Sequence, residues 1–273
     1  MQTLLFWRKT SFTLLFFLLF SATLSPLQAE EGTKKTLYGG VPGEQFTFNV
    51  HWMGIPAGRA EMKMNQAGPG KFDLEAMVET IGMVRFLHSL KDTLRSKGEW
   101  LENGGFRSTS YFKDQRKGSQ VRQVDYQFDR ETKVVTRLRK GEKPIPIKIS
   151  SIKVNDPLAV FYTLRGLSNL EPGKSLVWIT VDGRREYNMQ VDIGKPAQRF
   201  TPLGRFKIIP IKVKIPSSGE LFRQEEAIEI WLTDDERRMP VRVETRLSLG
   251  GVAADLVAYR DGRGGHGELG EER

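Results

Sequence analysis

The chain contains no cysteine, and this absence excludes several classes of protein. It rules out disulfide frameworks, zinc sites built on thiolates, iron–sulfur clusters and cysteine nucleophiles. It also rules out a bacterial lipoprotein, which carries its lipid on a cysteine. The folded chain must therefore be stabilised by packing and hydrogen bonding alone.

Histidine is scarce as well, since the 273 residues contain only His51, His88 and His266, far apart in sequence. The sequence has no H-E-x-x-H or H-x-H pair and no G-x-S-x-G elbow. It also has no phosphate-binding glycine loop that opens a helix after a strand. We therefore predict no catalytic residue, no metal site and no cofactor, and we do not expect an enzyme.

Acidic residues fall where turns and helix starts need them. The run 234–236 (Asp-Asp-Glu) lies between two predicted strands beside Arg237, and its spacing does not match an EF-hand calcium loop. Asp156 directly precedes Pro157, a pair typical of the start of a helix. We interpret the first group as a solvated turn and Asp156 as a helix cap rather than a functional acid.

The first 29 residues have the order of a secretory signal peptide. Arg8 and Lys9 precede the apolar run Ser11–Leu24, and Ala29 precedes an acidic pair. The alternative is an uncleaved anchor, but the apolar run is shorter than the roughly twenty residues that span a bilayer. We predict cleavage after Ala29, export to a periplasm, and no transmembrane segment in the mature chain.

The rest of the chain is dominated by strand patterns. Apolar residues alternate strictly from Gln45 to Trp52, which indicates a strand with one buried face. Turns are predicted at Gly54–Gly58 and at Asp182-Gly183, the second as a type I′ hairpin turn. Further strands are predicted at 60–64, 72–78, 121–128, 132–138, 174–182, 184–192, 205–215, 227–233, 241–247 and 252–259.

Two segments have helical signals. Residues 80–90 place Ile81, Val84 and Leu87 three apart, as in a short amphipathic helix. The second helix begins after Asp156, is apolar nearly all round and ends at Gly166, so we expect it to be buried against the sheet.

Together these patterns predict an all-β fold, a large curved antiparallel sheet or incomplete β-barrel. One or two short helices accompany it, one of them packed against the concave face. The predicted organisation is a signal peptide over 1–29, a single β-rich domain over 30–260 and a disordered Gly-rich tail over 261–273.

Three motifs resemble a family of exported bacterial proteins catalogued as domain of unknown function 3108. They are G-I-P-A-G at Gly54–Gly58, D-P-L at Asp156–Leu158, and W-L-x-x-D-x-x-R-x-P-V-R at Trp231–Arg242, in the order of the family. The resemblance runs from about Glu44 to Tyr259 and implies an exported β-rich protein without assigned catalytic residues. The last motif region is also similar in architecture to the open barrel of periplasmic lipoprotein carriers.

Basic residues outnumber acidic ones, giving a formal net charge of +9, and the stretch 107–140 is the most basic. We expect no nucleic-acid partner, because the protein is exported and lacks stacking aromatics interleaved with the cations. The candidate partner is an anionic envelope surface of lipid or lipopolysaccharide. The alternative is a solvated sheet face without a partner.

Five large aromatic residues are candidates for the lining of an apolar ligand site: Trp52, Phe86, Phe161, Trp178 and Trp231. The alternative is that they fill a core. Our leading hypothesis is a periplasmic, non-enzymatic binder or carrier of a hydrophobic or lipid-like ligand. The other hypotheses are a structural or protein-interaction component of the envelope, an enzyme, and an integral outer-membrane barrel, which the helix signal at 157–165 argues against.

Overall fold

A computed structural model of the protein describes residues 39–102, 104–215, 227–247 and 250–262. The signal peptide predicted over 1–29 and nearly all of the tail predicted over 261–273 lie outside this part of the chain. The described residues form fifteen strands and two helices. In chain order these are β1 (Gln45–Trp52), β2 (Ile55–Asn65), β3 (Lys71–Thr80), α1 (Gly82–Leu87), β4 (Leu90–Trp100), β5 (Phe106–Lys117), β6 (Gln120–Asp129), β7 (Val134–Arg139), β8 (Ile145–Lys148), α2 (Pro157–Arg165), β9 (Ser175–Asp182), β10 (Arg185–Ile193), β11 (Ala197–Thr201), β12 (Gly204–Lys214), β13 (Ala227–Thr233), β14 (Pro240–Leu247) and β15 (Gly250–Arg260).

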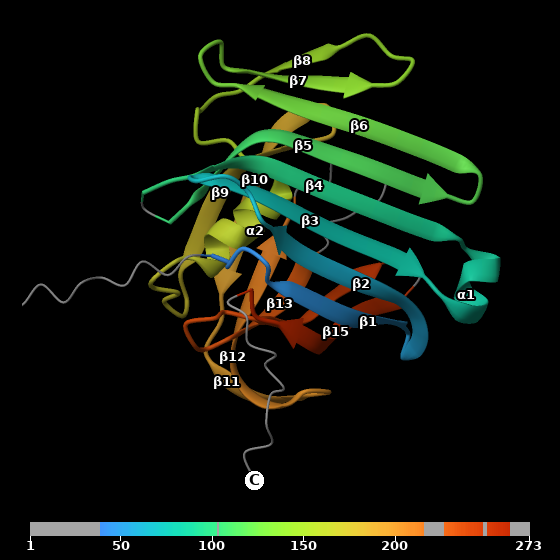
Figure 1. Cartoon of the computed structure of the whole chain (residues 1–273). Coiled ribbons are helices and arrows are strands. Elements are labelled where there is room, and N and C mark those ends of the chain that lie inside the picture. The colour runs from blue at the N-terminus through green and yellow to red at the C-terminus, as the bar shows by residue number, and fades with distance from the viewer. Residues whose placement is uncertain (1–38, 103, 216–226, 248–249, 263–273) are drawn as a thin grey trace, which may run out of the picture. The chain divides into compact units, whose positions relative to one another are not determined.

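All fifteen strands belong to one antiparallel sheet (Figure 1). The spatial order is β8-β7-β6-β5-β4-β3-β2-β1-β15-β14-β13-β12-β10-β9, and β11 pairs with β12 beside this path. The first and last strands of the chain, β1 and β15, are therefore neighbours in the middle of the sheet. The edge strands β8 and β9 are not paired with each other, so the sheet is not closed. This confirms the predicted all-β fold with an incomplete barrel.

The segment between β8 and α2 joins the two edges of the sheet. The backbone of Asn155 donates to the carbonyl of Ile179 on β9 at 3.2 Å and accepts from Val181 at 3.0 Å. A second contact comes from β6, two strands in from the edge strand β8, where the hydroxyl of Tyr126 accepts from the backbone N–H of Gly183 at 2.9 Å. The opposite edges are thus held together by hydrogen bonds that do not form a strand ladder between β8 and β9.

Helix α2 begins and is placed as the sequence predicts. Asp156 accepts hydrogen bonds from the backbone N–H groups of Leu158 and Ala159, and Pro157 occupies the first turn. Figure 1 shows α2 enclosed between the β3–β5 part of the sheet and the β9–β13 part. This confirms the prediction of a helix on the concave face.

Both sides of α2 contribute to the core. Val160 and Leu164 pack with apolar residues of β10, β12 and β13, whereas Leu158 and Tyr162 pack with residues of β2, β3 and β5. Two further buried clusters lie between β5–β7 and β9 and between β1 and β14–β15. The helix therefore fills one half of the concave side and holds distant parts of the sheet at a fixed separation.

Two predicted turns differ in position from the observed ones. The β1–β2 turn consists of Met53 and Gly54, both with positive φ (51° and 82°), and β2 resumes at Ile55 inside the stretch predicted as turn. The β9–β10 turn consists of Gly183 and Arg184, because Asp182 still pairs with Arg185. Only Gly183 has positive φ, so the turn follows the type II′ pattern instead of I′.

The helix predicted over 80–90 is only six residues long, Gly82–Leu87, and it exposes Met83 and Phe86 as well as Arg85. The helix ends before the three-residue periodicity of the sequence does, because Leu90, the last residue of that pattern, belongs to β4. Strands β4, β5, β8 and β11 were not predicted. Their sequences carry polar residues on both faces or are short, which removes the alternation on which strand prediction depends.

Candidate functional site

The concave face of the sheet is buried at the α2 end and open to solvent at the other end. On β1, Phe46 and Phe48 are buried, whereas Val50 and Trp52 on the same face are only half-buried. The same change occurs on β3, where Phe72 and Leu74 are buried. The half-buried concave residues toward the α1 end of these and neighbouring strands are Val50, Trp52, Ala60, Ala76, Val78, Val243, Val252 and Ala254.

Cross-strand pairing makes these residues one continuous surface. Val50 pairs with Ala254, which pairs in turn with Val243 on β14. Ala76 on β3 pairs with Met62, and Val78 pairs with Ala60. Three of these side chains are alanines, and they pack against the neighbouring buried clusters. We call this half-buried part of the concave face the apolar wall.

The opposite side of the concave face, on β4, β5 and β9, is polar. Lys113 donates to both carboxylate oxygens of Asp182 across the open edges, at 2.7 and 2.9 Å. Gln115 donates to Asp92 at 3.4 Å, and burial is the largest cause of the raised pKa of Asp92. Next to this pair, burial and Asp182 raise the pKa of Tyr126 to about 12, so the phenol stays protonated. We call this side the polar wall; it lies directly beside the apolar wall on the concave face, where Asp92 pairs with Val78.

The five aromatic candidates from the sequence fall in three places. Trp52, Phe161 and Trp178 lie on the concave side and are half-buried, the last two packed against a buried cluster that includes α2. Phe86 is 93% exposed on α1. Trp231 lies on the convex face of β13, where Arg199 and Arg242 stack on its ring at 5.6 and 5.2 Å from the centroid.

The D-P-L motif builds a buried polar cluster at the start of α2. One carboxylate oxygen of Asp156 accepts from Leu158 and Ala159, and the other accepts from the hydroxyls of Ser96 and Ser108, each at 2.6 Å. Asp156 is fully buried, and burial is the main cause of its raised pKa, against the hydrogen bonds that lower it. Asp156 is thus enclosed and holds the start of α2 in place, and its carboxylate is not accessible to a substrate.

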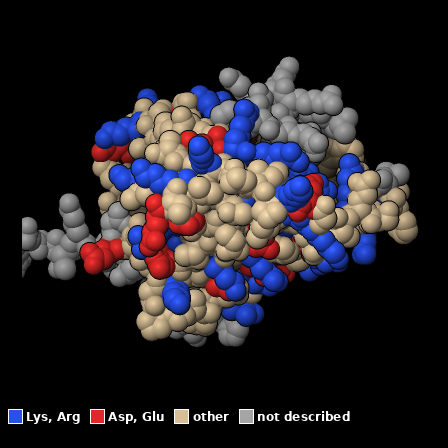
Figure 2. All heavy atoms as spheres, turned by 90° about the horizontal axis from the view of Figure 1, so that it is seen from above, with Lys and Arg blue, Asp and Glu red and all other residues tan. Residues whose placement is uncertain are grey.

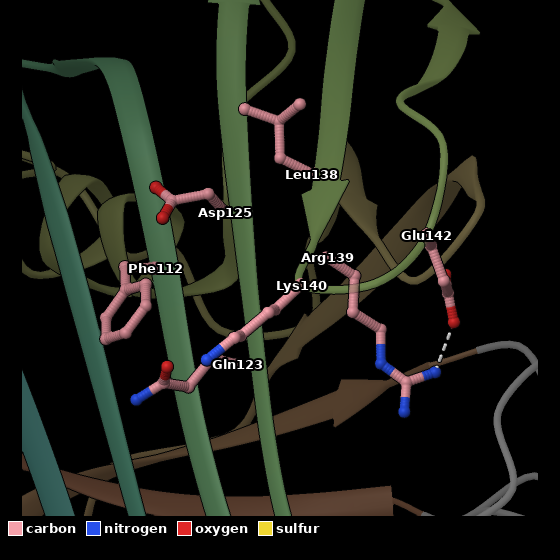
Figure 3. A pocket seen from close by; sticks show the side chains of 7 residues that line it. All are labelled: Phe112, Gln123, Asp125, Leu138, Arg139, Lys140 and Glu142. Atoms are coloured by element: carbon pink, nitrogen blue, oxygen red, sulfur yellow. Dashed lines mark hydrogen bonds and ion pairs between the residues drawn. The ribbon is translucent and has the colours of Figure 1, made fainter.

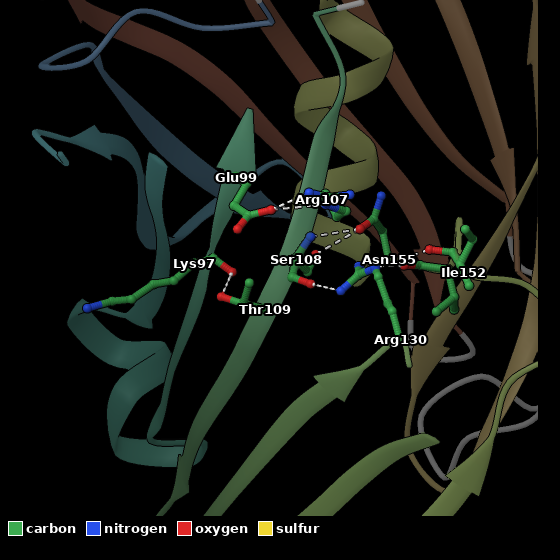
Figure 4. Close-up of polar contacts among 9 residues, drawn as sticks. Lys97, Glu99, Arg107, Ser108, Thr109, Arg130, Ile152 and Asn155 are labelled. Carbon is green, nitrogen blue, oxygen red and sulfur yellow. Dashed lines mark hydrogen bonds and ion pairs between the residues drawn. The ribbon is translucent and has the colours of Figure 1, made fainter. Parts of the chain in front are cut away.

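Asn155 extends this cluster to the sheet (Figure 4). Its side chain accepts from the backbone of Ser108 at 2.9 Å and donates to the carbonyl of Phe106 at 2.7 Å. Beside it, Arg130 reaches from β6–β7 and donates to carbonyl oxygens of Ser108, Ile152 and Val154. Asn155 and Arg130 therefore connect the two sides of the seam through several hydrogen bonds at this end.

A buried ion pair anchors the other end of α2. Arg165 donates to both carboxylate oxygens of Glu44, at 2.6 and 3.2 Å, and both side chains are 2% exposed. The guanidinium also donates to the backbone carbonyls of Arg237 and Arg238 and stacks on Phe46. This pair links the helix to the start of β1 and to the β13–β14 turn.

An open groove of about 320 Å³ lies on the convex face of β5–β7 (Figure 3). Glu142 forms ion pairs with Arg137, at 2.9 Å, and with Arg139, and these hydrogen bonds lower the pKa of Glu142. Burial raises the pKa of Asp125, to which Gln127 donates at 3.5 Å. The groove is lined by Phe112, Gln123, Asp125, Leu138, Arg139, Lys140 and Glu142.

The described part of the chain contains neither a metal-binding cluster nor a membrane-spanning helix. Within residues 39–102, 104–215, 227–247 and 250–262, no group of three or more His, Asp or Glu side chains is arranged to hold a metal ion. In the same part of the chain, neither helix is long and apolar enough to cross a bilayer.

The family model of DUF3108, a protein family of unknown function, matches residues 47–257 of the sequence. The chain belongs to the DUF3108 family. This confirms the resemblance carried by the three motifs, which in the structure form the β1–β2 hairpin, the start of α2 and the β13–β14 hairpin. No curated protein matches this DUF3108 chain in sequence.

Among solved structures, the DUF3108 chain is similar to a β-barrel-like DUF1849 protein from Brucella abortus. The two share 9% identity with a TM-score of 0.55, over 81% of this chain and 99% of that one, which supports a shared fold alone. A candidate exported protein with a YmcC-like fold from Bacteroides fragilis gives 10% identity, a TM-score of 0.36, and 82% and 98% coverage. A candidate lipoprotein from Parabacteroides distasonis shares 12% identity with a TM-score of 0.34, over 82% of this chain and 98% of that one. The last two scores are too low to carry an argument.

Sequence reasoning missed the residues of the two walls. The alanines of the apolar wall give no signal in a single sequence, because small apolar residues are common throughout the chain. The polar wall was missed for a related reason, since Asp92, Lys113 and Gln115 lie on two strands that the alternation of the sequence did not reveal.

Proposed function

We propose that this DUF3108 protein is an exported, non-enzymatic binder or carrier of a lipid-like ligand in the periplasm. Export rests on the signal peptide pattern at residues 1–29. The observation that carries the binding function is the apolar wall, an apolar surface on the concave face that stays half-exposed beyond the buried part of that face. Exposed apolar surface inside a concavity is the usual setting of a small-molecule site.

The apolar part of the ligand would lie along the apolar wall. Its contact surface is formed by Val50, Ala76, Val78 and Ala254, with Trp52 toward the open end of β1. Removing an alkyl chain from water there is favourable by roughly 0.8 kcal/mol for each buried CH₂ group. A chain of moderate length therefore suffices for binding without any covalent step.

The polar wall favours a ligand with one polar end. Gln115 and the Lys113–Asp182 pair face the same concavity and offer donors and an acceptor close to the apolar wall. A purely apolar molecule would leave these groups desolvated, which costs free energy. An amphipathic molecule such as a fatty acid or a phospholipid satisfies both walls.

The test is equilibrium binding of the fluorescent fatty acid cis-parinaric acid to the mature protein. We expect an increase in probe fluorescence that unlabelled fatty acid reverses. Ala254→Phe places a ring on the apolar wall and should weaken binding by about tenfold or more, because it occupies the space of the chain. Ala76→Phe, on β3, should have the same effect and serves as a second variant if the first unfolds.

The matched control is Ala253→Phe, one residue earlier on β15. Ala253 faces the convex side, opposite His51 and Glu244, so this ring should leave the probe affinity unchanged. Equal affinity in all three variants, or no probe binding by the unmodified protein, would contradict the proposal. The second result, combined with a defined protein partner in crosslinking, would favour a structural component of the envelope.

A further inference from the structure

Large apolar side chains are exposed together at the open end of the sheet. Met53 (67% exposed) and Ile55 (62%) belong to the β1–β2 turn region, and Met83 (83%) and Phe86 (93%) belong to α1. Helix α1 contacts β2, and the backbone of Ile81 donates to the carbonyl of Ala57 at 2.9 Å, so the two groups are adjacent. We call Met53, Ile55, Ile81, Met83 and Phe86 the apolar tip.

The connections at this end of β1–β6 and the strand residues beside them carry more basic than acidic side chains. In this antiparallel run, the β1–β2, β3–β4 and β5–β6 connections lie at the same end of the sheet. Residues 53–59, 79–92 and 114–121 contain five cations (Arg59, Arg85, Lys91, Arg116 and Lys117) and three acids (Glu79, Asp92 and Asp114).

Only some of the cations beside the apolar tip form ion pairs. Lys91 pairs with Glu79 and Arg116 with Asp114. Elsewhere in the basic stretch 107–140, Arg107 pairs with Glu99 and Lys113 with Asp182, and Arg137 and Arg139 share Glu142. Among the residues that the structure describes, Arg59, Arg85 and Lys117 form no ion pair. Figure 2 shows Lys and Arg interspersed with Asp and Glu over the face that is seen from above in Figure 1.

We propose that the apolar tip docks the protein on an anionic lipid bilayer. Phe86, Met83 and Ile55 would enter the boundary between headgroups and acyl chains, as the apolar side chains of interfacial helices do. Arg59, Arg85 and Lys117 lie beside them and would contact the anionic headgroups, each cation contributing to binding at low ionic strength. These three cations without an ion pair are what selects an anionic surface over a neutral one.

This proposal goes beyond ligand binding and does not depend on it. Val50 and Trp52 lead directly into the Met53-Gly54 turn, and Val78 leads into α1. The apolar wall therefore opens at the same end as the apolar tip. Docking through the tip would turn the concavity toward the bilayer, from which a lipid-like ligand could enter or leave.

The test is flotation of the mature protein with vesicles of phosphatidylglycerol or of phosphatidylcholine. We expect binding to phosphatidylglycerol that weakens as salt is added, and little binding to phosphatidylcholine. The double variant Met83→Ser, Phe86→Ser should lower the vesicle affinity by at least about tenfold, because two apolar side chains no longer enter the bilayer. Arg59→Gln and Arg85→Gln should each lower it about fivefold, on phosphatidylglycerol only.

The controls are matched for chemistry. Phe200→Ser removes an exposed aromatic (76%) from β11, and Lys148→Gln removes an exposed cation from β8; neither should change flotation. Unchanged flotation of the Met83→Ser, Phe86→Ser variant would overturn the proposal. The absence of flotation with both kinds of vesicle would also overturn it. In that case, capture of a protein partner by crosslinking from position 86 would indicate a protein-binding surface instead.

The same variants separate the two proposals. Binding of cis-parinaric acid should remain unchanged in the Met83→Ser, Phe86→Ser variant, since neither side chain belongs to the apolar wall. Loss of probe binding in the Ala254→Phe variant with normal flotation would support both proposals. Normal flotation without any probe binding would contradict the ligand site and leave the docking surface standing.

Discussion

Replacement of Asp156 by alanine tests whether the buried cluster at the start of α2 holds the helix in place. The substitution removes the acceptor for two backbone N–H groups and for the hydroxyls of Ser96 and Ser108. Loss of an N-cap costs about 1 kcal/mol. Ser108 retains Asn155 as an acceptor at 3.1 Å, whereas the fully buried Ser96 hydroxyl loses its acceptor, at a cost of about 1–3 kcal/mol.

The expected loss in the free energy of unfolding is therefore about 3 kcal/mol. Urea unfolding followed by tryptophan fluorescence and by circular dichroism measures it. A second substitution, Ser96→Ala in the Asp156→Ala background, should recover about 1 kcal/mol or more, because no buried hydroxyl then lacks an acceptor.

The control is Asp129→Ala. Asp129 also accepts from two backbone N–H groups, those of Glu131 and Thr132, but it is exposed and bonds to no buried hydroxyl. Its replacement should cost much less than that of Asp156. Equal losses in the two variants, or no recovery by Ser96→Ala, would refute the reasoning.

Three further outcomes are expected. Glu44→Gln leaves the buried charge of Arg165 without its counter-ion and should lower the free energy of unfolding by about 3–5 kcal/mol, measured by urea unfolding. A loss below about 1 kcal/mol would show that this ion pair does not anchor α2. Gly98→Ala should prevent folding or strongly lower the melting temperature, because a Cβ at this position would lie 2.0 Å from a backbone carbonyl oxygen of β5. The control Gly251→Ala, whose Cβ would meet no atom within 4 Å, should leave the melting temperature nearly unchanged. The pKa of Asp156 is raised in the folded protein, so ionisation of its carboxyl lowers the free energy of unfolding as pH rises from the unfolded-state pKa to the folded-state pKa. The difference in stability between the unmodified protein and the Asp156→Asn variant should therefore change with pH only in that acid window. A difference that does not depend on pH would contradict the raised pKa.

The sequence predicts the parts of the fold whose residues alternate cleanly or carry a strong local signal. The alternation in Gln45–Trp52 gives β1, and the Asp156-Pro157 pair gives the start of α2 to the residue. Strand β4 could not be recognised, because its concave face carries Asp92, Ser96 and Gly98 in place of large apolar residues. These polar residues serve contacts with α2 and with β5 that only the folded chain brings together.

The candidate site is predictable only in part for a similar reason. Aromatic residues stand out in a sequence, and Trp52, Phe161 and Trp178 do lie on the concave side. Their size alone does not distinguish them from Phe86, which is exposed on α1, or from Trp231, which lies between two arginines on the convex face. The direction in which each side chain points depends on strand register and on where a short helix ends, and neither is fixed by composition.

The most direct test of the ligand-binding function is native mass spectrometry of the mature protein purified from the periplasm of the bacterium that produces it. We expect a species heavier than the bare chain by one lipid-like molecule, which organic extraction removes and added fatty acid or phospholipid restores. Only the mass of the bare chain, unchanged after addition of either lipid, would contradict the account.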